Sequence, residues 1–193
     1  MKGASRAQAI VEFAFIAPLL VVLILGSVDA SYLVSNKLLM ITAARHGARI
    51  AAQLGGTGSS PASNACQGTL ASGTTQTSID QQIVQSVAAV AQNSNFALID
   101  SIDIYKPTAG DGSYTSGDKL DSWSINSART AWVAGSSQTY LLSLRCQGIL
   151  GNEAPIAVRV TWHYSGVNSI IKNLNGITEY ADELMTLKDP NAP

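Results

Sequence analysis

The sequence predicts an α+β protein in which a long N-terminal helix precedes a small domain with an antiparallel sheet. Three observations carry this prediction. Residues 13–28 form an uncharged apolar run, apolar or small residues then recur at helical intervals to about Leu54, and residues 156–164 alternate between apolar and polar side chains. A chain of 193 residues and 20.2 kDa holds one compact domain and a membrane segment, but hardly two substantial cores.

Charge is distributed unevenly along the chain. The formal net charge is −1 and the pI is about 6.1, so the composition does not indicate a nucleic-acid partner. Residues 1–52 carry five basic and two acidic side chains, a net charge of +3, whereas residues 53–193 carry seven basic and eleven acidic ones, a net charge of −4. The two parts of the chain are therefore expected to have different roles.

The first element is a helix long enough to cross a membrane. The run FAFIAPLLVVLILGSV reaches the roughly 20 residues needed for a bilayer core when residues 9–11 are added and Glu12 is tolerated. Lys2 and Arg6 precede it with no acidic residue between them. By the positive-inside tendency the N-terminus stays cytoplasmic and the bulk of the chain lies outside.

This helix is expected to continue to about Leu54, where the segment GGTGSS supplies a stop signal. A single helix over residues 8–54 would be about 70 Å long at 1.5 Å per residue. Its last part carries a stripe of small residues on which another backbone could approach closely. We favour packing of this stripe against the chain's own domain over packing against another subunit. The stripe comprises Ala43, Ala44, Gly47, Ala48, Ala51 and Ala52.

The remaining elements are shorter. We divide the chain into a leader over 1–7, the helix over 8–54, a polar connection over 55–78 and a domain over 79–193. The connection is uncharged and rich in Gly, Ser and Thr. A short amphipathic helix follows it, for which Ser78 and Gln81 fit a capping box.

Two strands are predicted within the domain. In the segment 97–105, Leu98, Ile102 and Ile104 would share one side with Asp100, and in the segment 156–164 the even-numbered residues would face the core. Residues 140–145 are a candidate third strand, and 122–138 are ambiguous. The segment 177–187 fits a helix or an edge strand, and we favour the strand.

Enzymatic chemistry lacks support in the sequence. His46 and His163 have no Cys or carboxylate at a metal-ligand spacing, so each is expected to be a surface or packing histidine. The segment GGTG at 55–58 lacks the ending of a phosphate-binding loop, and no GxSxG elbow is present. Trp123, Trp132 and Trp162 are too dispersed for a stacking platform and suit core or interface roles. We expect no cofactor, no metal and no catalytic residue.

The segment RAQAIVEFAFIAPLLVVLILGSVDASYLVSNKLLMITAARHGARIAA resembles the N-terminal signature of TadE-like pseudopilins of tight-adherence pilus systems. The resemblance covers roughly the first quarter of the chain. It implies cleavage by a prepilin peptidase after Ala7, with Gln8 as the new N-terminus and Glu12 at the fifth mature position. The chain departs from the family at Ala7, where Gly is usual.

Glu12 and Pro18 are the predicted assembly residues. A carboxylate at the edge of an apolar helix is costly to bury, so Glu12 is either an interfacial acid or the partner of the Gln8 amine on a neighbouring subunit. Pro18 removes a backbone hydrogen bond within the apolar helix, as a functional hinge or as a tolerated membrane proline.

Cys66 and Cys146 are the two cysteines of the chain. A domain outside the cytoplasm would sit in an oxidising compartment, so we predict one disulfide, worth about 4 kcal/mol in the chain-entropy model. Two unpaired thiols are the alternative. This disulfide would join the polar connection to the strand region.

The resulting functional prediction is a pilin-like or pseudopilin subunit that is processed by a prepilin peptidase and acts in pilus assembly or surface adhesion by helix packing. Its partners would be the peptidase, other pilin or pseudopilin subunits and the inner membrane before assembly, with the mature subunit in a pilus or at the cell surface. The alternative is a secreted or membrane-anchored domain whose conventional signal peptide is cleaved after Ala30.

Overall fold

The computed structural model describes residues 4–54, 75–109, 112–145, 155–166 and 174–184. The first helix, α1 (Ala4–Leu54), is followed by α2 (Gln76–Ala91) and by five strands: β1 (Ala97–Tyr105), β2 (Leu120–Ile125), β3 (Trp132–Gln138), β4 (Pro155–Tyr164) and β5 (Leu174–Leu184). The predicted fold class, a long apolar helix followed by a small antiparallel sheet, is confirmed.

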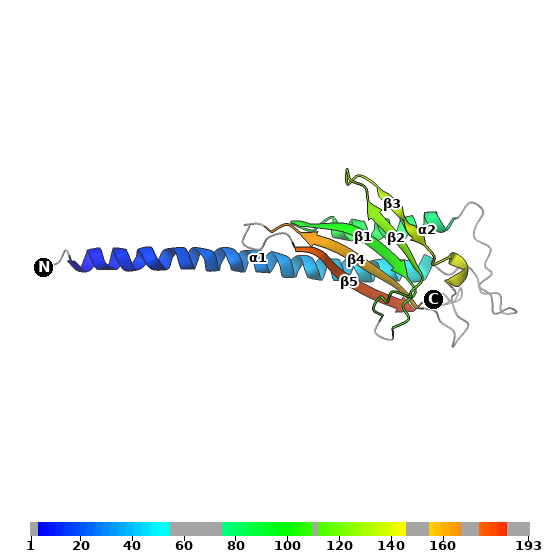
Figure 1. The fold of residues 1–193 in the computed structure, drawn as a ribbon, viewed down its shortest axis with the longest axis horizontal. Helices are drawn as coiled ribbons and strands as arrows, with labels where there is room; N and C mark the ends of the chain where they lie inside the picture. Colours follow the sequence, from blue (N-terminus) through cyan, green and yellow to red (C-terminus); the bar gives the residue numbers. More distant parts are fainter. Residues whose placement is uncertain (1–3, 55–74, 110–111, 146–154, 167–173, 185–193) are drawn as a thin grey trace, which may run out of the picture.

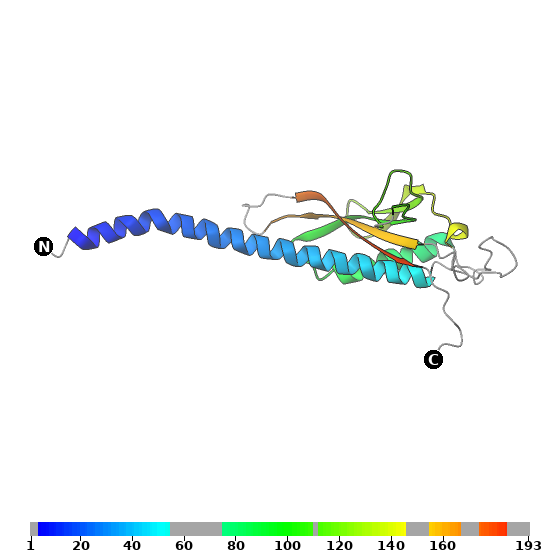
Figure 2. The same cartoon turned by 90° about the horizontal axis from the view of Figure 1, so that it is seen from below.

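All the strands pair antiparallel, in the order β3-β2-β1-β4-β5. Both helices pack on one face of the sheet. Helix α1 covers β4 and β5, and α2 lies beside α1 and contacts β1 and β3. Figures 1 and 2 show that only the second half of α1 lies against the sheet, whereas its first half projects beyond the domain.

The core lies between the sheet and the helices. The alternation predicted for residues 156–164 is confirmed from Val158 onward, because Val158, Val160, Trp162 and Tyr164 are fully buried and the residues between them are partly exposed. Ala157 is buried as well as Ile156. The small-residue stripe of α1 is buried as well, except for the half-buried Ala52, and a Cβ atom on Gly47 would lie 2.3 Å from a methyl carbon of Val87 on α2. The stripe therefore packs against its own domain, as favoured from the sequence.

The face predicted for Leu98 is wrong. Strand β1 covers residues 97–105 as predicted, but its register against β4 shifts between Ile99 and Ser101. Asp100 is the extra residue, so Ala97 and Ile99 face the core before it and Ile102 and Ile104 after it, while Leu98 is exposed. A bulge of this kind reverses side-chain alternation, which the sequence pattern alone assumed to be continuous.

Two further segments differ from the prediction. Helix α2 begins at Gln76, earlier than the predicted capping box of Ser78 and Gln81 implies, because Thr75 is its N-cap and Ser78 is the third helical residue, which closes the box. The extended backbone of Thr75 lets its hydroxyl accept a hydrogen bond from the Ser78 backbone at 3.2 Å. Within the candidate strand 140–145, residues Leu142–Leu144 form a 3-10 turn, so that prediction is wrong.

The ambiguous segment 122–138 contains most of β2 and all of β3. The strand favoured for the C-terminal segment is confirmed up to Leu184 as β5. Both Cys66 and Cys146, and therefore the predicted disulfide, lie outside the described residues, as do the GGTG segment and most of the polar connection.

Candidate functional site

The first half of α1 exposes a continuous apolar surface. Twelve large apolar side chains between residues 10 and 28 are exposed, up to 79% for Phe15. Among the described residues, α1 alone has the length and the apolar composition to cross a membrane. An apolar surface of this extent needs a lipid or protein partner. Its residues are Ile10, Val11, Phe13, Phe15, Ile16, Leu19, Leu20, Val21, Val22, Leu23, Ile24 and Val28.

The helix enters its own domain at Asp29. Asp29 is fully buried, whereas each of residues 10–28 is at least partly exposed, and its backbone carbonyl accepts a hydrogen bond from the Tyr164 hydroxyl at 3.4 Å. One turn further on, the rings of Tyr32 and Phe96 meet edge to face with centroids 5.6 Å apart. These contacts fix the point at which α1 leaves the sheet.

Asn36 secures the same junction to the turn between α2 and β1. Its side-chain amide donates to the Asn95 carbonyl at 2.5 Å, and its side-chain oxygen accepts from the Asn95 backbone N–H at 3.2 Å. This paired hydrogen bonding satisfies two backbone groups of a turn in which Phe96 has a positive φ of 63°. The projecting half of α1 thus extends from a junction that these contacts hold to the domain.

The predicted processing and assembly residues all lie on the projecting half of α1. Ala7 and Gln8 are helical, and Glu12 is exposed. Pro18 is within the helix, and Figure 2 shows that the N-terminal, dark blue part of α1 is inclined to the remainder. Proline removes one helical hydrogen bond and commonly bends a helix in this way.

A buried ionic network lies at the other end of the domain. The Arg145 guanidinium contacts Asp80 of α2 and Asp121 of β2, each at 2.5 Å, and all three side chains are completely buried. It also donates to the Tyr140 carbonyl at 3.1 Å, while Gln76 donates to Asp121 at 2.7 Å. The network ties α2, β2 and the turn after β3 together.

Sequence reasoning missed this network because its members are 24 to 65 residues apart in the chain. No spacing pattern links Arg145 to either carboxylate. Burial raises the pKa of Asp80 to about 6 even though the Arg145 guanidinium acts to lower it, and the nearby Asp121 carboxylate adds to the increase.

The histidines have no metal-site geometry. The Nδ1 atom of His163 lies 2.8 Å from a carboxylate oxygen of Asp100, which also contacts Arg129 at 3.5 Å, and His46 is exposed on α1. Within the described ranges, no group of three His, Cys, Asp or Glu side chains could hold a metal ion. Asp100, His163 and Arg129 form a polar cluster at the β1 bulge.

Comparison with known proteins finds a similarity in the N-terminal part of the chain. Residues 7–49 match the family of TadE-like proteins. No curated protein and no solved structure matches the chain. The matched segment begins at the predicted cleavage position, includes the projecting half of α1 and ends within the stripe of small residues. The N-terminal helix of this chain is therefore similar to that of TadE-like proteins.

Proposed function

We propose that the chain is a pilus-associated pseudopilin subunit of a tight-adherence system, assembled through the projecting half of α1. The observation that carries the proposal is the exposed apolar surface over residues 10–28 on a helix whose later part is built into the domain core. The TadE-like match over residues 7–49 supports this role. Such a subunit anchors in the membrane by this half-helix and later buries the same surface against other subunits.

We further propose that a prepilin peptidase cuts after Ala7. Cleavage would give Gln8 a free, positively charged amine at the start of α1. A neighbouring subunit's Glu12 would pair with this amine, so that each buried charge is compensated by the other. Because Glu12 follows Gln8 by four residues, the pair would offset adjacent helices by about 6 Å along their axes.

Orientation follows from the charges that precede the apolar run. Lys2 and Arg6 would hold the N-terminus in the cytoplasm, and the domain over residues 79–193 would lie outside before assembly. The mature subunit would then be found in a pilus or at the cell surface.

Intact mass tests the processing step. A mature chain that begins at Gln8 supports the proposal, whereas one that begins at Ser31 supports the alternative of a conventional signal peptide cleaved after Ala30. The helix fits both interpretations, since Ala30 lies at the junction between the projecting half of α1 and the half that packs against the sheet. A mature N-terminus at Ser31 would remove the whole proposed assembly surface and would exclude the pseudopilin mechanism.

Substitution of Glu12 tests the assembly step. Glu12→Ala should leave the mature mass unchanged except for the substitution, but should reduce recovery in sheared surface filaments at least about tenfold, because the partner amine would be buried without its counter-charge. Glu12→Gln preserves the side-chain shape and should show the same defect if charge is the cause. Normal incorporation of both variants would contradict the pairing.

A further inference from the structure

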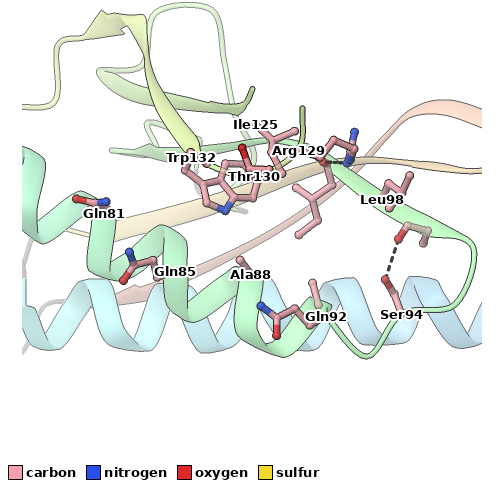
Figure 3. A pocket seen from close by; sticks show the side chains of 14 residues that line it. Gln81, Gln85, Ala88, Gln92, Ser94, Leu98, Ile125, Arg129, Thr130 and Trp132 are labelled. Carbon is pink, nitrogen blue, oxygen red and sulfur yellow. Dashed lines mark hydrogen bonds between the residues drawn. The ribbon is translucent and has the colours of Figure 1, made fainter. Parts of the chain in front are cut away.

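The domain has a cleft that the proposed assembly role does not use. It encloses about 710 Å³ between α2, the first part of β1 and the hairpin formed by β2 and β3 (Figure 3). This volume is typical of sites for small ligands, which range from about 300 to 1,000 Å³. No residue that lines the cleft belongs to α1, so occupation of the cleft need not compete with packing of that helix.

One wall of the cleft is a polar face of α2. Gln81, Gln85, Ala88 and Gln92 recur at intervals of four, three and four residues and therefore share this face. The opposite face of α2, which includes Ile83 and Val87, is buried in the core. Each glutamine amide offers both donors and an acceptor, so this wall can donate hydrogen bonds to hydroxyl groups and accept hydrogen bonds from them.

The facing wall is aromatic. Trp132 of β3 is half-buried and is paired across the strands with Ile125, and Figure 3 shows the indole on the cleft side of the hairpin, facing α2. An indole presents a broad apolar face together with one N–H donor. Such a surface suits a ligand with both an apolar face and polar edges.

The cleft is nearly neutral. Arg129 is the charged residue in its lining, and its guanidinium already donates to the Ile99 carbonyl and contacts Asp100 at 3.5 Å. The hairpin turn holds Arg129 at a positive φ of 54°, with Asn126 accepting from its backbone N–H at 2.8 Å. An anionic ligand would therefore find little uncompensated positive charge here, and a purely apolar ligand would leave the glutamine amides unpaired.

We propose that this cleft binds a neutral polyhydroxylated ligand, a short oligosaccharide. The Trp132 indole would pack against the C–H face of one sugar ring, and the amides of Gln81, Gln85 and Gln92 would exchange hydrogen bonds with hydroxyl groups along the length of the oligosaccharide. An arrangement of one aromatic platform and several amides distinguishes this class from anions and from lipids.

The test uses the full chain in a detergent that has no sugar headgroup, such as lauryldimethylamine oxide. Lactose, maltose, cellobiose and N,N′-diacetylchitobiose are titrated at millimolar concentrations and followed by saturation-transfer NMR and tryptophan fluorescence. At least one of these sugars should show saturation transfer and shift the fluorescence. Gln85→Ala and Trp132→Phe should each weaken its binding by roughly threefold to tenfold.

Two controls are available on the same elements. Gln82 is exposed on α2 outside the cleft, and Val133 is exposed on β3 beside Trp132 with its side chain on the opposite face. Gln82→Ala and Val133→Ala should bind like the unchanged chain. The proposal is overturned if none of the four sugars gives saturation transfer, or if the cleft variants and the control variants bind alike. Processing and filament incorporation do not enter these readouts, so this result is separate from that of the proposed function.

Discussion

Arg145 is the residue on which one end of the domain depends, because a single guanidinium faces two buried carboxylates. A one-to-one pair would be neutral, whereas Arg145 with both Asp80 and Asp121 ionised leaves an excess negative charge where no solvent reaches. Burial raises the pKa of Asp80 to about 6, and the Asp121 charge adds to this increase, so protonation of Asp80 relieves the excess charge. Stability should therefore depend on pH.

We expect the stability of the domain to decrease as the pH rises from about 4 to about 6. The folded state holds the Asp80 proton more tightly than the unfolded state, in which the pKa is near 3.8, so raising the pH through this window favours unfolding. The decrease in Tm between pH 4.5 and pH 7 should be on the order of 5 °C. Circular-dichroism melting curves of the full chain at a series of pH values measure it.

Variants at single carboxylates separate the contributions to this slope. Asp80→Asn should remove most of the decrease in stability between about pH 4 and about pH 6. The pKa of Glu179 is shifted in the same direction, because burial raises it against the lowering effect of Lys37. Glu179→Gln should therefore remove a smaller part of the decrease in stability. Asp118→Asn is the control: burial is outweighed there by hydrogen bonds from Thr108 and Thr115, which lower the pKa of Asp118, so its contribution has the opposite sign and its loss should not flatten the slope. An unchanged slope in Asp80→Asn would disprove the assignment.

At the scale of elements, the approach of α1 to α2 is set by small side chains. Gly47 lies where any larger residue on α1 would meet Val87, and the neighbouring alanines complete the contact. This close approach places α1 and α2 together beneath one face of the sheet. Packing of this density tolerates little added volume.

Gly47→Ala should therefore destabilise the domain by about 1–2 kcal/mol. Alanine would gain close to 1 kcal/mol of helix propensity, but its Cβ atom would sit 2.3 Å from the Val87 methyl carbon and force the helices apart. Chemical denaturation of the full chain followed by circular dichroism measures the change.

Two companion variants sharpen this experiment. A Cβ atom at Gly26, on the projecting half of the same helix, meets nothing within 4 Å, so Gly26→Ala should be neutral or slightly stabilising. Val87→Ala added to Gly47→Ala should cost less than the sum of the two single substitutions, because it removes the atom that is contacted. A Gly47→Ala chain more stable than the unchanged one would mean that the helices are not in such close contact.

At the scale of the whole molecule, one continuous helix, α1, lies partly in the domain core and partly outside the domain. Its buried apolar side chains, Met40, Ala43, Ala44, Ala48 and Ala51, all follow Ala30, whereas the exposed apolar surface of residues 10–28 precedes it. The folding of the domain and the solubility of the chain are therefore separable.

Removal of residues 1–30 should leave a folded domain that needs no detergent. Its Tm should fall by only a few degrees, since the Tyr164 contact with Asp29 is lost while the helix core is retained. Removal of residues 1–54 should abolish cooperative unfolding, because the sheet would lose the helix that covers β4 and β5. Melting curves and size-exclusion chromatography without detergent distinguish the outcomes. Aggregation of the shorter deletion would contradict this division of α1.

The sequence by itself determined the elements whose signal is local. The apolar run, the helix end at Leu54, the extent of β1 and the alternation of β4 all follow from a backbone period that neighbouring residues display together. The similarity of α1 to TadE-like proteins could be recognised for the same reason, since the matching residues form one uninterrupted segment.

Only the tertiary structure decided how distant segments meet. The bulge at Asp100, the Arg145 network and the cleft between α2 and β3 each join residues far apart in the chain, and single-sequence periodicity holds no information about such pairs. The extra residue at Asp100 reversed the face of Leu98, and the position of Gly47 against Val87 settled which partner the stripe of small residues contacts. In each case the deciding term is packing between elements, which appears only when the chain is folded.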